Sequence, residues 1–167
     1  MANTSTVSVA YASNITITET FSVANAADNT ILVNTYNQTG TLTASSTVPA
    51  TKQATFALTM SGGTGSVDLT ALPGLNANET VDGTGLKAQL LLLLNPSSNA
   101  NSITVAKGAS NGYGWNTAGT SWTVSLSPGQ WAMFGGNDVG PDVASGARLL
   151  DVTGTGSQVL DVSIVLG

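Results

Sequence analysis

The sequence contains neither cysteine nor histidine. Without cysteine it has no disulfide framework and no thiolate metal site, and without histidine it lacks the commonest general base and metal ligand. Serine and threonine are abundant, but their hydroxyl groups become nucleophiles only beside a base, and no Ser-x-x-Lys spacing is present. We therefore expect a protein that is not an enzyme and that carries no cofactor.

Charged residues are also scarce, at 8% of the chain, and the net charge is −5. Only four side chains are cationic: Lys52, Lys87, Lys107 and Arg148. Because nucleic-acid binding depends on neutralising phosphates with several Lys or Arg side chains, the sequence argues against a nucleic-acid partner. A surface covered by hydroxyl and amide groups also has little charge repulsion between copies, which favours self-association.

Long apolar segments are missing. No run approaches the roughly 18 apolar residues that a membrane-spanning helix needs, so we expect no membrane partner. Residues 1–5 show neither a basic nor an apolar segment of the secretory type, although a processed mature chain could look the same. No secretory signal is therefore visible in this sequence.

Residues 86–94, which read LKAQLLLLL, form the most apolar stretch of the chain. Turn residues flank the stretch on both sides, and nine residues between such breaks favour a strand. Strict alternation would place Leu86, Ala88, Leu90, Leu92 and Leu94 on the core face and Leu91 and Leu93 on the outer face. An outer face is normally polar, so either another part of the chain, including Val7, Val9 and Tyr11, or another subunit should cover Leu91 and Leu93.

Alternating apolar residues predict further short strands throughout the chain, and no segment shows a helical period. The N-terminal region predicts two short strands within residues 7–23 and a loose hairpin within residues 31–43. Further strands are predicted at residues 51–60, 67–71, 103–105, 122–126, 131–134, 148–152 and 159–166. We therefore predict one all-β domain over residues 1–167, an antiparallel β-sandwich of eight to ten strands. Residues 1–50 form either an N-terminal arm or extra strands.

Two groups of residues suggest binding chemistry. Residues 137–142 bring Asp138 and Asp142 into one loop with hard oxygen ligands of the kind that calcium takes, but the EF-hand spacing is absent, so we predict no metal site. Tyr113 and Trp115 lie in a glycine-rich loop and are candidates for contact with a sugar or a partner. Trp122 shares a strand face with Val124 and Leu126, which favours a place in the core.

Several strand-and-turn segments together resemble the small β-sandwich proteins encoded beside the structural genes of tailed bacteriophages. These segments are VDLTALPG at 67–74, VDGTGLK at 81–87, GASNGY at 108–113, LSPG at 126–129 and GTGS at 154–157. The resemblance covers roughly residues 55–167 and includes no catalytic signature. It implies a jelly-roll-like sandwich, usually a trimer, that sits on the capsid as a cement or decoration protein or forms part of a fibre. It also implies a place in the virion after assembly in the host cytoplasm.

The leading hypothesis is a non-enzymatic structural protein of the virion that forms a homo-oligomer, by resemblance a homotrimer, and binds the major capsid protein or another virion protein. The candidate contact residues are Leu91, Leu93, Tyr113 and Trp115. One alternative is a carbohydrate- or receptor-binding head of a tail fibre or adhesin that uses Tyr113 and Trp115. Another is a hydrolase that uses two acidic residues, since two carboxylates at a suitable separation suffice for glycoside hydrolysis.

Overall fold

The computed structural model describes residues 6–21, 30–74, 79–115, 121–135 and 140–167. Every regular element within these ranges is a β-strand, and twelve strands form four sheets in which all the pairs are antiparallel. The prediction of an all-β, antiparallel fold is confirmed, with more strands than the eight to ten expected. Within the same ranges, no helix is long and apolar enough to cross a membrane.

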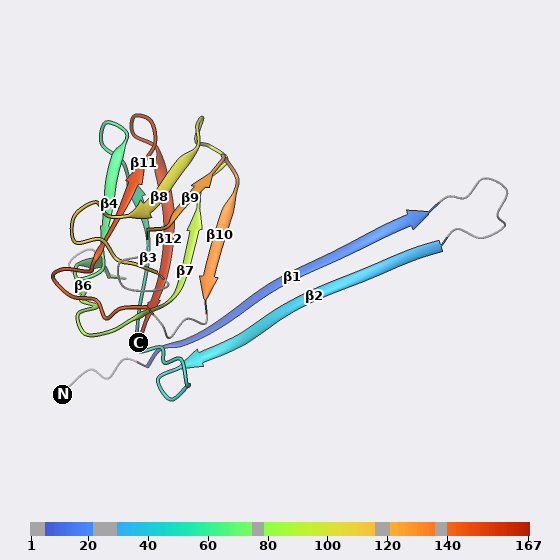
Figure 1. The fold of residues 1–167 in the computed structure, drawn as a ribbon, viewed down its shortest axis with the longest axis horizontal. Coiled ribbons are helices and arrows are strands. Elements are labelled where there is room, and N and C mark those ends of the chain that lie inside the picture. The colour runs from blue at the N-terminus through green and yellow to red at the C-terminus, as the bar shows by residue number, and fades with distance from the viewer. Residues whose placement is uncertain (1–5, 22–29, 75–78, 116–120, 136–139) are drawn as a thin grey trace.

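Two four-stranded sheets form the body of the protein (Figure 1). Sheet I has the strand order β10-β7-β12-β3, and sheet II has the order β4-β11-β8-β9. The bounds in sheet I are Trp131–Gly135 (β10), Ala88–Leu94 (β7), Val159–Leu166 (β12) and Lys52–Thr59 (β3). Those in sheet II are Thr64–Asp68 (β4), Leu149–Thr153 (β11), Ile103–Lys107 (β8) and Thr123–Leu126 (β9), while Leu72–Pro73 (β5) and Thr80–Val81 (β6) pair separately.

The strands of the body pair in a nested order. The first of these eight strands, β3, pairs with the last, β12, and β4 pairs with the next to last, β11. Inside these pairs, β7 pairs with β10, and β8 pairs with β9. The chain therefore runs as a long antiparallel ribbon that is folded over, so that each sheet receives strands from both halves of the chain.

The main core lies between the two sheets. Its fully buried side chains come from both layers, including Leu160, Val162 and Ile164 of β12 in sheet I and Leu150 and Val152 of β11 in sheet II. Trp122, Val124 and Leu126 also pack in this core, as their shared strand face predicted. Burying side chains of this size stabilises the fold by about 1.5–3 kcal/mol each before entropy is counted.

The face assignment of Leu91 and Leu93 is wrong, and a β-bulge explains the error. Ala88 of β7 pairs with Leu166, but Leu90 pairs with Val165, so Gln89 is an extra residue in the ladder. An extra residue moves every later side chain to the opposite face of the sheet. Leu91 and Leu93 consequently lie in the main core at 0% exposure, while Leu90, Leu92 and Leu94 face outward.

The N-terminal region forms one long hairpin. Strands β1 (Ser8–Phe21) and β2 (Thr30–Thr43) pair without interruption from Ser8↔Thr43 to Phe21↔Thr30. The prediction of two short strands followed by a loose hairpin is therefore wrong, because each pair of short segments belongs to a single strand. Figure 1 shows that this hairpin, which we call the arm, leaves the body at its lower end and extends well beyond it.

Candidate interaction surface

The arm has two chemically different faces. Residues directly opposite each other in an antiparallel pair lie on the same face, so Val9 and Leu42 share a face with the pair Ile15 and Tyr36. Ile17 and Tyr11 belong to this apolar face by alternation. The other face carries alanine, threonine, serine and asparagine, as in the pairs Ala10↔Thr41, Thr16↔Thr35 and Asn14↔Asn37.

The base of the arm packs on the outer face of sheet I. A second cluster of buried residues contains Leu42 of the arm, Ala50 of the following loop, Leu90 of β7 and Val165 of β12. Partly buried Val7, Val9, Tyr11 and Val48 pack against it, and we call these eight residues the base cluster. Of the two covers considered for Leu91 and Leu93, neither applies to these core leucines; Val7, Val9 and Tyr11 do pack on the outer face of sheet I, where they cover Leu90.

Gly40 makes room for the aromatic ring in this cluster. Gly40 is the cross-strand partner of Tyr11, and a Cβ atom at Gly40 would lie 2.7 Å from Cε1 of the Tyr11 ring. Since real Cβ atoms do not approach other atoms so closely, a residue larger than glycine would push the ring away. The local sequence therefore lets the tyrosine lie across its own hairpin.

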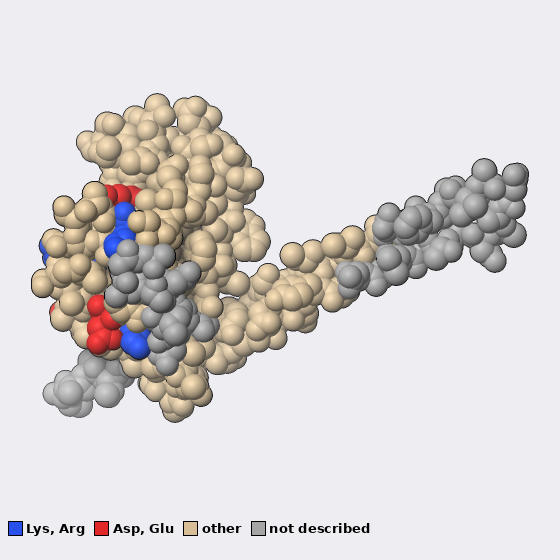
Figure 2. Space-filling model, in the orientation of Figure 1, with Lys and Arg blue, Asp and Glu red and all other residues tan. Residues whose placement is uncertain are grey.

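Beyond the base cluster, the large apolar side chains of the arm that the structure describes are exposed. The exposed fractions are 54% for Ile15, 60% for Ile17 and 61% for Tyr36. Residues 6–18 and 35–43 contain no charged residue, and Figure 2 shows charged atoms on the body but none on the described part of the arm. Large exposed apolar side chains on a segment without charged residues are characteristic of a contact surface.

A second uncovered apolar surface lies on the outer face of sheet I. Leu92 and Leu94 of β7 face outward and pair with Met133 and Trp131 of β10, so that these four side chains lie on one face. Trp131 is 59% exposed, and the other three are partly exposed. We call these four residues the ridge. The ridge continues directly from Leu90 of the base cluster, because residues 90, 92 and 94 share a face.

The two aromatic residues proposed as contacts are inside the protein. Tyr113 is 0% exposed and Trp115 is 6% exposed, and the Trp115 ring lies 5.9 Å from that of Phe134 between centroids. The Tyr113 hydroxyl accepts a hydrogen bond from the Ala88 backbone N–H and donates one to the Pro141 carbonyl, each at 2.9 Å. Burial raises the pKa of Tyr113, which keeps the phenol neutral and able to donate. These residues hold the core together and do not form a surface platform.

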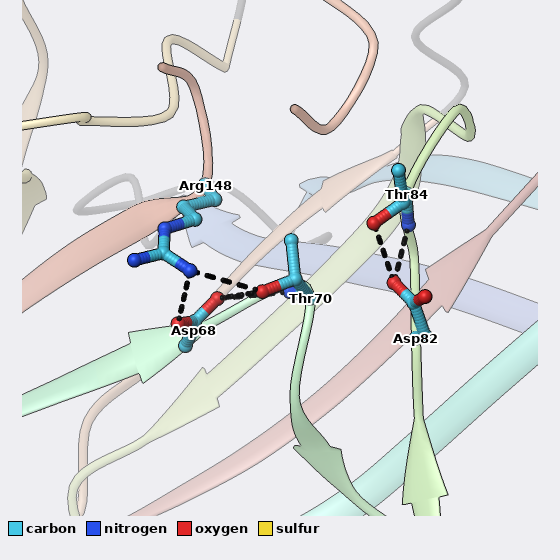
Figure 3. A network of polar contacts seen from close by, with 5 residues as sticks. All are labelled: Asp68, Thr70, Asp82, Thr84 and Arg148. Carbon is cyan, nitrogen blue, oxygen red and sulfur yellow. Dashed lines mark hydrogen bonds and ion pairs between the residues drawn. The ribbon is translucent and has the colours of Figure 1, made fainter. Parts of the chain in front are cut away.

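Several of the acidic residues have structural partners. Asp68 forms an ion pair with Arg148 at 3.1 Å and accepts hydrogen bonds from the backbone N–H and the hydroxyl of Thr70 (Figure 3). Asp82 accepts the equivalent two bonds from Thr84, at 2.9 and 2.6 Å. The Thr84 hydrogen bonds lower the pKa of Asp82, because they stabilise the ionised carboxylate. Both carboxylates therefore stabilise tight turns after strands.

The loop considered for calcium is only partly within the described residues. Asp142 is exposed, while Asn137, Asp138 and Val139 lie outside the described ranges. Across the residues that are described, no group of three or more His, Cys, Asp or Glu side chains could hold a metal ion.

An open hollow of about 410 Å³ lies beside the base of the arm. Its walls mix one cation with two carboxylates and several small polar groups, and they bring the segment before β1 close to β3 and β6. The lining residues are Val7, Thr51, Lys52, Gln53, Glu79, Thr80, Val81 and Asp82. The Lys52 ammonium donates a hydrogen bond to the Asp82 carbonyl at 2.5 Å, so this cation holds two walls of the hollow together.

Comparisons of the chain with models of protein families, with curated proteins and with solved structures found no match. The resemblance to bacteriophage structural proteins therefore stays a prediction carried by the sequence segments alone.

Sequence reasoning missed the uncovered residues of the arm and the ridge. The odd-numbered apolar residues Val7, Val9, Tyr11, Ile15 and Ile17 keep one alternation throughout, and this was the signal for a single amphipathic strand. No comparable signal marked Trp131, because a strand that reads WAMF is apolar at every position and alternation cannot say which side chains point outward.

Proposed function

We propose that this chain is a non-enzymatic structural protein that acts by assembly: a homo-oligomer that attaches to the shell of a virus particle as a cement or decoration protein. The observation that carries the proposal is the arm, a hairpin of two 14-residue strands that leaves the body with an uncovered apolar face. At about 3.3 Å per residue, each strand of the hairpin is about 45 Å long. A connection between two strands of a sandwich does not need a projection of this length.

The character of the arm supports a role in assembly. An isolated two-stranded hairpin is at best marginally stable in water, so a long one is expected to gain stability from a surface that it covers. Its base already does so through the base cluster. The segment just beyond the base cluster, with Ile15, Ile17 and Tyr36 exposed, has the composition of a surface that another molecule covers.

The body supports the viral part of the proposal less directly. Nested pairing of eight strands in two sheets is the arrangement expected of a jelly roll, which combines two Greek keys and is common in viral capsid proteins. The segments that resemble bacteriophage structural proteins lie in this body. Attachment to the major capsid protein and a place in the virion rest on that resemblance.

The carbohydrate-binding alternative receives no support from its proposed residues. Tyr113 and Trp115 are buried, and the Trp122 indole N–H donates a hydrogen bond to the Tyr113 carbonyl at 3.0 Å, which ties this segment into the core. An aromatic sugar platform requires exposed ring faces. We therefore prefer assembly to glycan recognition.

Particle association tests the proposed function. Virus particles that are purified on a density gradient from cells producing both the particle and this chain should contain the protein. Its copy number should stand in a simple ratio to that of the shell protein. Absence from purified particles would contradict the virion role. Specific binding on a glycan array, or turnover on a panel of polysaccharides, would instead support the two alternatives.

A further inference from the structure

We propose that the arm of one copy docks through its exposed apolar face on the ridge of a second copy. This inference rests on the proposed self-assembly and names the two surfaces that meet. The donor surface is the distal arm face with Ile15, Ile17 and Tyr36, and the acceptor surface is the ridge, which comprises Leu92, Leu94, Met133 and Trp131.

The contact inside one chain shows that these two faces are complementary. In the base cluster, Val9, Tyr11 and Leu42 of the arm already pack on Leu90 and Val165 of sheet I. The uncovered part of the arm continues the same arm face, and the ridge continues the same sheet face. The exposed arm face therefore extends the arm side of the base cluster, and the ridge extends its sheet side.

The arm cannot fill its own ridge while its base stays packed. The base cluster lies at the Leu90 end of β7, whereas the ridge runs from there toward Leu94 and Trp131. Figure 1 shows the arm leaving the body at the lower end of β7, away from the upper end where β10 begins. The exposed arm face and the exposed ridge thus diverge within one chain, and a second copy supplies the missing partner for each.

The part of the arm nearer the body also lacks the features that keep β-strands from associating, and the charged residue of β1, Glu19, lies beyond it. Natural sheets protect free edges with charged residues, proline or bulges. Residues 8–18 and 35–43 contain neither proline nor a charged residue, and the pairing of β1 with β2 continues without a register shift. Nothing in these residues opposes docking on the apolar ridge, whose nearest charged neighbour is Asp161, the cross-strand partner of Leu94.

The ridge sets the size of one contact, because its four side chains lie on only two adjacent strands. A specific interface buries more surface than so small a patch provides. A reciprocal exchange, in which each of two copies gives and receives an arm, doubles the buried area and is therefore favoured over a single contact.

Cross-linking between copies that carry single cysteines at different positions tests the contact. Because the chain has no native cysteine, every cross-link forms at an introduced one. One preparation carries Gln38→Cys, on the apolar arm face opposite Ser13, and the other carries Ser163→Cys, beside Leu92 on the outer face of sheet I. The matched control is Asn37→Cys, on the opposite face of the arm. Full-length chains are mixed, concentrated together and treated with a short bismaleimide.

The expected result is a Gln38→Cys to Ser163→Cys product in several-fold excess over the Asn37→Cys control. Predominant Gln38→Cys to Gln38→Cys products would mean that arms pair with arms, which overturns the inference while leaving self-assembly intact. Equal yields for the two arm positions would also overturn it.

Light scattering on two lysine variants gives an independent measurement. Ile17→Lys, on the apolar arm face, should convert the oligomer to monomer at concentrations where the adjacent Thr16→Lys, on the polar face, leaves it assembled. An oligomer unaffected by Ile17→Lys would exclude arm docking but not self-assembly. A wild-type monomer at high micromolar concentration would contradict both, and particle association would then decide separately whether the protein belongs to a virion.

Discussion

Replacing Leu93 by alanine should destabilise the body far more than replacing its neighbour Leu92. Leu93 is 0% exposed in the core between the sheets, with Val162 and Ala132 as its cross-strand neighbours. Leu→Ala at such a site costs about 2–5 kcal/mol, because it removes buried methyl groups and leaves a cavity in a close-packed interior. Leu92 faces outward between Met133 and Ser163 and is partly exposed, so its truncation should cost about 1 kcal/mol.

Urea denaturation followed by circular dichroism measures this difference. With a urea dependence of about 2 kcal/mol per molar, a loss of 3 kcal/mol lowers the midpoint by about 1.5 M, against about 0.5 M for Leu92→Ala. The two proteins should be compared at low concentration, because Leu92 belongs to the ridge and assembly would add to apparent stability. A larger loss for Leu92→Ala than for Leu93→Ala would show that the bulge at Gln89 is absent and that the leucines face the other way.

Three further outcomes are expected. Tyr113→Phe should lower the free energy of unfolding by about 1–3 kcal/mol in the same urea assay, because it leaves the buried Ala88 N–H without its acceptor. Asp82→Asn should make the melting temperature fall less steeply in acid. The pKa of Asp82 is lowered in the folded protein, so its carboxylate stabilises the fold above the unfolded pKa of 3.8, and this contribution is lost as the pH falls through the folded pKa. The melting temperature of the wild type should therefore fall more between pH 5 and pH 3 than that of the variant. Gly63→Ala should destabilise by about 1–3 kcal/mol, since φ is +82° and the new Cβ would lie 2.7 Å from the Gly154 carbonyl oxygen; unchanged melting would contradict that geometry.

Alternation predicted those strands in which apolar and polar residues contrast. β12 (Val159–Leu166) was predicted with its observed bounds, and Leu160, Val162 and Ile164 occupy the core face as expected. β7 differs because all five residues from Leu90 to Leu94 are leucine. Such a run looks the same in either register, so the sequence could not reveal that the bulge at Gln89 exchanges its two faces.

The candidate surface was less predictable than the fold. The arm's periodicity was visible in residues 7–17, but periodicity does not state which strand pairs with which, and the departure of β1 and β2 from the body depends on that choice. The exposure of Trp131 depends on the position of β10 at the edge of sheet I and on the bulge in its neighbour β7. Both are consequences of tertiary structure.

The nested pairing of the body has a kinetic consequence. The innermost pair, β8 and β9, is separated in sequence only by residues 108–122, whereas the outermost pair joins residues near 52 to residues near 166. Proteins dominated by such distant contacts have a high contact order and typically fold in milliseconds to seconds, because the entropy of closing long loops is lost before their contacts form.

β12 lies between β7 and β3 in sheet I, so that sheet stays open until residues 159–166 have been synthesised. Until then the leucines of β7 lack β12, the strand that pairs with them in the folded sheet. The arm, which precedes β7 in the sequence, has already been synthesised by that stage. Because exposed apolar strands make incomplete chains prone to aggregate, the position of β12 at the end of the sequence makes the interval before its synthesis the most hazardous one for this fold.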